Sequence, residues 1–168
     1  MKKAYITRYA AIGDHIHSSH LPRLLKEREG YDFVAVEYNQ KGFYVYQNNP
    51  FIDQHIQFEP NVYPIKDYPV SILHKRHAEM VKRYGFDLHI DLWNSIERAY
   101  IAMEDQSEYY LSSKERREMY GGQNYYDQVS EFAGFPQHKG LVGELYFTPE
   151  EENAVESIYD KFYQGKFV

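Results

Sequence analysis

The sequence has no cysteine among its 168 residues. This absence excludes a disulfide framework, a thiolate metal site and a cysteine nucleophile, because each of them needs a thiol. The length is that of one domain and is enough to bury a substantial core.

An excess of positive charge is also missing, since the formal net charge is −6 at pH 7. Proteins that bind duplex nucleic acid or dock on anionic membranes normally present a basic face, so the charge argues against both. No window approaches the roughly 18 apolar residues of a membrane span, and we expect no transmembrane segment. The start of the chain reaches Arg8 and Asp14 before an apolar core develops, unlike a signal peptide. We therefore expect a cytoplasmic protein.

Three common motifs of nucleotide-binding and hydrolytic enzymes are absent. No G-x-G-x-x-G follows the first apolar run, no P-loop occurs, and no serine lies in a nucleophile elbow. The sequence therefore lacks a dinucleotide fingerprint, and its chemistry has to be sought in less specific patterns.

Short apolar runs alternate with amphipathic stretches along most of the chain. The runs predict strands at 3–9, 31–38, 52–58 and 86–93. The amphipathic stretches predict helices at 14–29, 70–84, 94–103, 124–133 and 149–163, and a short helix or turn at 40–48. A kink or an irregular first turn is expected at Pro22. Such alternation with short connections predicts an α/β, Rossmann-like parallel sheet with helices on both faces. Its ligand site would lie at the carboxyl ends of the strands, near residues 8–14, 38–42, 59–66 and 91–95.

The stretch AAIGDHIHSSH at 10–20 contains the first candidate site. Gly13 would allow a tight turn after the first strand, and Asp14 would then be the N-cap of the first helix. Capping alone explains such an aspartate. A carboxylate at this rim can also accept a proton from a bound hydroxyl, which is the catalytic interpretation. Arg8 belongs to the same rim and is a candidate for binding substrate.

Three histidines, His15, His17 and His20, follow this turn closely. Their spacing matches no usual zinc motif, so we expect no metal site in this chain. His17 lies one helical turn from Asp14, where it could bind a ligand oxygen or Asp14 itself.

The segment FDLHIDLWN at 86–94 contains the second candidate site. Asp87, His89 and Asp91 alternate, so they share one face of the predicted strand. The two aspartates could simply bind the backbone of nearby loops. Asp91 and Asn94 also lie near the carboxyl end of this strand, where a ligand would bind.

Tyrosine is abundant, with 18 residues. These side chains could fill the edges of the core, or they could form a polar aromatic surface for carbohydrate. Likewise, the glycine pair in MYGGQNYY at 119–126 is explained by a surface loop or by a lid over a substrate.

Five segments together match one known family in the same order. They are AYITRYAAIGDHIHSSHLPRLLKER, NNPFIDQHI, YGFDLHIDLWNSIERA, YYDQVSEFAGFP and ELYFTPEEENAVESI. They resemble the bacterial lipopolysaccharide heptosyltransferases, glycosyltransferase family nine. The chain departs from this family at His20, where a proline is common, and at Trp93, where a glutamine is usual.

The resemblance implies one half of a GT-B architecture, with residues 1–165 as an N-terminal, acceptor-side domain. Residues 166–168 would begin a second domain that binds a nucleotide-sugar donor, typically ADP-heptose. Gly13 and Asp14 match the family's glycine–aspartate turn, whose aspartate deprotonates the acceptor hydroxyl. The partner implied is a glycan or lipid-linked sugar acceptor. A binding module for sugar or protein, and a flavodoxin-like nucleotide-binding domain, are the alternatives that the residues leave open.

Overall fold

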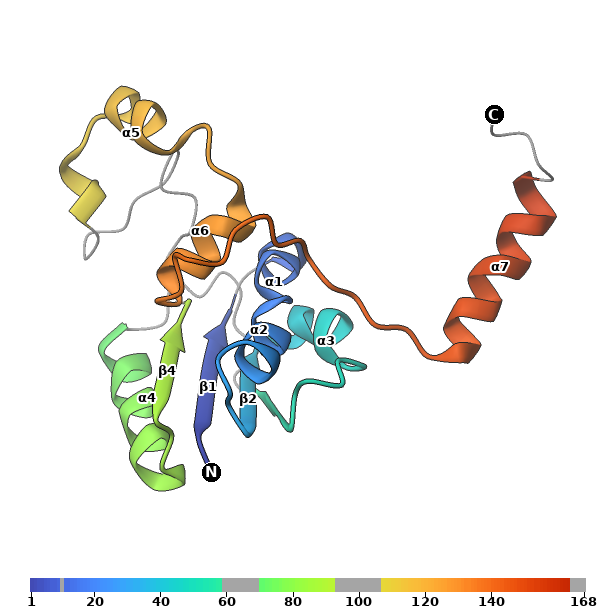
Figure 1. Cartoon of the computed structure of the whole chain (residues 1–168), viewed down its shortest axis with the longest axis horizontal. Helices are drawn as coiled ribbons and strands as arrows, with labels where there is room; N and C mark the ends of the chain where they lie inside the picture. Colours follow the sequence, from blue (N-terminus) through green and yellow to red (C-terminus); the bar gives the residue numbers. More distant parts are fainter. Residues whose placement is uncertain (10, 59–69, 93–106, 164–168) are drawn as a thin grey trace.

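A computed structural model of the chain describes residues 1–9, 11–58, 70–92 and 107–163. Its strands alternate with helices up to the fourth strand, and helices follow from there (Figure 1). The elements are β1 Lys3–Arg8, α1 Ile12–Ser18, α2 Leu21–Glu27, β2 Phe33–Tyr38, α3 Gln40–Tyr46, β3 Gln54–Gln57, α4 Val70–Tyr84, β4 Leu88–Asp91, the 3-10 helix η2 Ser107–Tyr110, α5 Ser113–Tyr120, α6 Tyr125–Phe132 and α7 Pro149–Tyr163.

The four strands form an all-parallel sheet with the order β3-β2-β1-β4. The strand order reverses at β1, because β2 and β3 extend the sheet on one side of it and β4 extends it on the other. At the carboxyl end of β1, Arg8 pairs with Tyr38 and Thr7 pairs with Asp91. Ligands of open α/β sheets bind at such a switch point, so this end of β1 and β4 is where a site is expected.

One face of the sheet carries the larger hydrophobic core. Every second residue of β1, β2 and β4 points to this face, as the two-residue period of a strand requires. Helices α2, α3 and α6 cover it with apolar side chains. The core cluster consists of Ala4, Ile6, Leu21, Leu25, Tyr31, Val34, Val36, Tyr38, Val45, Tyr46, Ile52, Ile90, Leu92, Val129 and Ala133.

Helix α4 covers the opposite face. Tyr5 of β1 and Ala35 of β2 are fully buried there with Phe86, and Met80 and Val81 of α4 pack against them. The predicted Rossmann-like fold, a parallel sheet with helices on both faces, is therefore confirmed.

The predicted helix at 14–29 is two helices, α1 and α2. Pro22 lies in the first turn of α2, where its missing N–H costs no helical hydrogen bond. The interruption lies at Ser19 and His20, so the chain breaks into two helices and does not merely kink or start irregularly at Pro22. The predicted helix at 94–103 and the loop between the third strand and α4 lie outside the described residues.

An extended segment, residues 141–148, leads from the body of the fold to α7 (Figure 1). It is fixed against α1 and α2, because the backbone N–H of Glu144 donates to Ser19 Oγ at 2.7 Å and Arg23 pairs with the Glu144 carboxylate at 2.5 Å. Helix α7 itself stands away from the sheet (Figure 1). Among the described residues, no helix has the length and apolar character that a membrane span requires.

Candidate active site at the carboxyl end of β1

Arg8 and Asp14 form an ion pair where β1 ends. Arg8 Nη2 lies 2.5 Å from Asp14 Oδ1, and its Nη1 donates to the backbone carbonyl of Leu92, next to β4. The Arg8 side chain is 3% exposed, whereas that of Asp14 is 27% exposed. A buried guanidinium therefore holds a carboxylate that still reaches solvent.

Asp14 is the third residue of α1, so the prediction that it is the N-cap of this helix is wrong. Ala11 is the N-cap, and its backbone N–H donates to Asp14 Oδ2 at 3.1 Å. A carboxylate in the first turn also interacts favourably with the helix dipole. Gly13 consequently lies in the helix and not in a preceding turn. A Cβ at Gly13 would meet none of the described residues within 4 Å, so the described part of the chain leaves the helix start open on that side.

This arrangement can perform acid–base chemistry. A carboxylate offers about four lone-pair sites, and Arg8 and the Ala11 N–H together use two of them. The exposed part of Asp14 can therefore accept the proton of a bound hydroxyl. Arg8 holds Asp14 in place, and its own burial leaves little of it for a ligand.

His17, the predicted neighbour of Asp14, lies against α6. Its ring centroid is 5.1 Å from that of Tyr125 and 5.2 Å from that of Tyr126. The structure thus brings His17 to two tyrosines, and among the described contacts none joins it to Asp14.

The other two histidines of this stretch are buried within the core. His15 Nε2 lies 2.9 Å from Asn39 Oδ1, and His20 Nε2 lies 3.0 Å from Ser130 Oγ. Burial lowers the pKa of His20 to about 4, so its ring is neutral at pH 7. Within the described part of the chain these histidines do not converge on one point.

Asp91 belongs to a different site from Asp14, because it lies on the α4 face of the sheet. Thr7 and Arg8 are consecutive in β1, so their side chains point to opposite faces. Thr7 Oγ1 donates to Asp91 Oδ1 at 3.0 Å on one face, and Arg8 binds Asp14 on the other. Asn94, the other residue predicted to bind substrate, lies outside the described residues.

The α4 face contains a buried polar network that the sequence analysis missed. Glu37 of β2 is 0% exposed and accepts hydrogen bonds from the hydroxyls of Tyr5 and Tyr9 and from Arg76 Nε at 3.0 Å. Burial beside this carboxylate raises the pKa of both tyrosines, so they remain protonated. The signal in the sequence was a single glutamate in the apolar run YDFVAVEY, since a buried carboxylate needs partners.

Two histidines extend this network toward Asp91. His77 of α4 is 2% exposed; its Nε2 lies 2.9 Å from the Tyr9 hydroxyl and its Nδ1 lies 3.5 Å from Asp91 Oδ2. His89 of β4 lies 3.2 Å from Thr7 Oγ1, and burial lowers its pKa to about 4.

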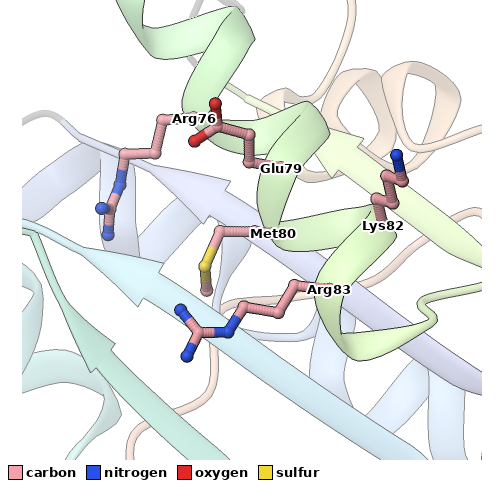
Figure 2. Close-up of a pocket in the computed structure, with 5 residues that line it drawn as sticks. All are labelled: Arg76, Glu79, Met80, Lys82 and Arg83. Atoms are coloured by element: carbon pink, nitrogen blue, oxygen red, sulfur yellow. The ribbon is translucent and has the colours of Figure 1, made fainter.

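A shallow pocket lies beside this network, along α4. It is lined by Arg76, Glu79, Met80, Lys82 and Arg83. Figure 2 shows Arg76, Met80 and Arg83 reaching from α4 over the strands, with Lys82 pointing away from them. Arg76 is engaged by Glu37, and Arg83 lies over the Tyr84 ring, 5.4 Å from its centroid. None of the predicted site residues lines this pocket.

Comparison with known proteins supports the fold and little beyond it. No protein-family model matches the sequence, and no curated protein matches it. Among solved structures, the chain is similar to the crystal structure of a glycosyl transferase family 9 protein from Veillonella parvula, with a TM-score of 0.56 and 14% identity. The match covers 96% of this chain and 50% of that one, so this chain spans about half the length of its neighbour. At this identity the likeness establishes a shared Rossmann-like fold.

Proposed function

We propose that this chain is the acceptor-binding domain of a heptosyltransferase-like glycosyltransferase, with Asp14 as its general base. The observation that carries the proposal is the Arg8–Asp14 pair, a held but solvent-reaching carboxylate at the switch point of the sheet. The structural likeness to a glycosyl transferase family 9 protein supports the same assignment. The open start of α1 at Gly13 leaves room for an acceptor to approach.

In this reaction Asp14 takes the proton of the acceptor hydroxyl while the hydroxyl oxygen attacks the anomeric carbon of the donor sugar. The bond from that carbon to the nucleoside diphosphate breaks, and the diphosphate leaves with the electron pair. Attack from the opposite side inverts the anomeric configuration. The donor, an ADP-heptose-like nucleotide sugar met in the cytoplasm, would be bound by a separate domain, which also stabilises the leaving diphosphate.

The test is an assay of sugar transfer by the product of the complete reading frame that includes this chain. The donor is ADP-heptose, and the acceptors are a panel of lipopolysaccharide core fragments and simple glycans. Mass spectrometry detects the transfer product. We expect Asp14→Asn to lower transfer by a factor of about 100 to 10,000, the usual range for a lost general base. Transfer by Asp14→Asn at the parental rate would remove Asp14 from this role.

Asp127→Asn is the matched control, because Asp127 also lies in the first turn of a helix that covers the same face of the sheet. Its carboxylate accepts a backbone N–H, that of Gly140, at 2.9 Å, but no arginine holds it in the described structure. The proposal predicts full transfer by this variant. Thermal melts of both variants separate lost chemistry from lost folding.

A non-catalytic module that binds sugar is the second candidate, favoured by exposed aromatic side chains on α3. Phe43 and Tyr44 are 45% and 67% exposed, and aromatic rings cover the C–H faces of sugars well. Binding of a glycan in the panel by the purified chain, together with no transfer by the complete protein, would favour this function.

A further inference from the structure

Three metal-binding side chains converge on the α4 face of the sheet. His77 comes from α4, and His89 and Asp91 come from β4, where their alternation places them on one face. One ligand atom from each residue lies within 4.8 Å of the others. His77 is nearly fully buried, and the Asp91 side chain is 29% exposed, so the group is buried on the His77 side and reaches solvent on the Asp91 side.

The hydrogen bonds around His77 fix the position of its ring proton. The Tyr9 hydroxyl has one hydrogen, which it donates to Glu37 Oε1 at 2.7 Å. It must therefore accept from His77 Nε2, 2.9 Å away, and this nitrogen carries the proton. In a neutral ring the other nitrogen, Nδ1, then presents its lone pair.

A carboxylate oxygen lies close to this nitrogen. His77 Nδ1 is buried and has no hydrogen-bond partner among the described residues, and Asp91 Oδ2 lies 3.5 Å from it. Two electron-rich atoms at this separation repel each other unless a cation lies between them. Ligand atoms of a tetrahedral zinc site, with bonds of about 2.1 Å, lie roughly 3.4 Å apart, which is close to the observed distance.

We propose that His77, His89 and Asp91 bind a divalent transition-metal cation of the zinc class. Two imidazoles and one carboxylate suit Zn²⁺ or Co²⁺, whereas Mg²⁺ and Ca²⁺ prefer all-oxygen sites. His74 lies one turn before His77 on α4, is 53% exposed, and has its Nε2 4.0 Å from Asp91 Oδ2. It is placed to complete the coordination from the solvent side, in competition with water.

The surroundings of the group are those of a metal site with oriented ligands. The Tyr9–Glu37 pair holds His77 by its Nε2, and the Thr7 hydroxyl holds Asp91 by Oδ1 at 3.0 Å. Such outer partners fix the ligating atom of His77 and the orientation of Asp91. Because the Thr7 hydroxyl donates to Asp91, it accepts from His89 Nε2 at 3.2 Å, so His89 would bind the cation through Nδ1. The site is independent of the proposed glycosyl transfer, because it lies across the sheet from Asp14.

The experiment is a metal titration of the purified whole chain after treatment with a chelator. Zn²⁺ is added in competition with a chromophoric chelator at pH 7.5, and Co²⁺ is added separately to record its visible absorption. We expect one equivalent of Zn²⁺ with a dissociation constant of micromolar or tighter, and Co²⁺ bands of a four- or five-coordinate nitrogen and oxygen site. Asp91→Asn and His89→Asn should each weaken Zn²⁺ binding by a factor of 100 or more, and Tyr9→Phe by about 10.

His138→Gln is the matched control, because His138 forms a His–carboxylate pair with Glu29 elsewhere, at 2.6 Å. This variant should bind Zn²⁺ as the parent does. The proposal is overturned if the parent shows no saturable 1:1 binding, or if Asp91→Asn and His89→Asn both bind Zn²⁺ like the parent. Circular dichroism confirms folding of both variants, and either folded variant suffices for the test. The absence of saturable 1:1 binding is also the result expected if His77 is protonated and forms an ion pair with Asp91.

Discussion

Each face of the sheet holds a carboxylate near the carboxyl end of β1, but the two carboxylates differ in their exposure to solvent and in their partners. On one face a single ion pair, Arg8–Asp14, leaves a carboxylate 27% exposed. On the other face Glu37 is fully buried, and its oxygens are taken by two tyrosines and an arginine. The difference shows which of the two carboxylates can react with a ligand. A carboxylate near solvent, such as Asp14, can act on a ligand. A buried carboxylate that already accepts three hydrogen bonds, such as Glu37, holds its neighbours in place.

Arg76→Met should produce the largest loss of stability. It removes the cation beside the buried Glu37, and a buried charge that loses its partner costs about 3 to 5 kcal/mol. Since Arg76 itself is 36% exposed, we expect the lower end, about 3 kcal/mol, from urea unfolding.

Arg83→Met is the control for this change, because Arg83 is on the same helix and has no ion pair in the described structure. It should change the free energy of unfolding by less than about 0.5 kcal/mol. Equal losses in the two variants would mean that Glu37 does not depend on Arg76.

Acid should destabilise the α1–α6 face through His20. Burial lowers the pKa of His20 from 6.5 to about 4, so the unfolded chain binds more protons between these values. The contribution of the neutral ring is complete above pH 6.5 and is lost as the pH falls toward 4. At about 1.36 kcal/mol per unit, the free energy of unfolding falls by roughly 3 kcal/mol between pH 7 and pH 4.

The measurement is urea unfolding of the parent and of His20→Gln from pH 7 to pH 4. Glutamine does not titrate, so the pH dependence of the variant should be shallower by the stated amount. Parallel curves for the two proteins would show that His20 is not the acid-sensitive group.

Asp14→Asn should cost less stability than Arg76→Met. Arg8 is left buried without a full negative charge beside it, but asparagine can still accept one hydrogen bond from it. We expect a loss of about 1 to 2 kcal/mol, measured by thermal or urea unfolding of the purified chain. Asp127→Asn should lose about 0.5 kcal/mol or less, because among the described residues its carboxylate accepts a hydrogen bond from one backbone N–H. A larger loss in Asp127→Asn than in Asp14→Asn would contradict the importance assigned to the arginine.

The sequence pattern was sufficient to predict the sheet, because strands buried on both faces read as short apolar runs. It also placed Arg8, Gly13 and Asp14 together, since they are close in the chain. It could not show that Asp91 faces away from Asp14, because this depends on the pairing of Thr7 with Asp91 across two strands. His77 was visible only as one more position in an amphipathic helix, and its partners, Tyr9 and Asp91, lie just after β1 and on β4.

Helix starts and breaks were predicted less accurately than the strands, for a local reason. Aspartate is favoured both at the N-cap and in the first turn, so the residue type alone cannot separate the two positions. Ala11, the observed N-cap, has no side chain able to cap a helix, and Asp14 instead accepts the backbone N–H of Ala11 from within the first turn. Likewise, Pro22 is compatible with a kink or with a new helix start, and the structure has the start.

Gly13→Ala should stabilise the fold slightly, and it therefore gives the sharpest test of where the acceptor binds. No residue that the structure describes lies within 4 Å of the added methyl group, and alanine is favoured over glycine in a helix by up to about 1 kcal/mol. We expect a gain of about 0.5 kcal/mol in urea unfolding. In contrast, a Cβ at Gly42, on α3, would lie 2.7 Å from Tyr38 Cβ and 2.9 Å from the His15 ring, so Gly42→Ala should lose stability.

If the acceptor approaches Asp14 over the start of α1, Gly13→Ala will raise the KM for the acceptor in the complete protein while stabilising the fold. An unchanged KM would place the acceptor elsewhere, whatever the stability of the variant.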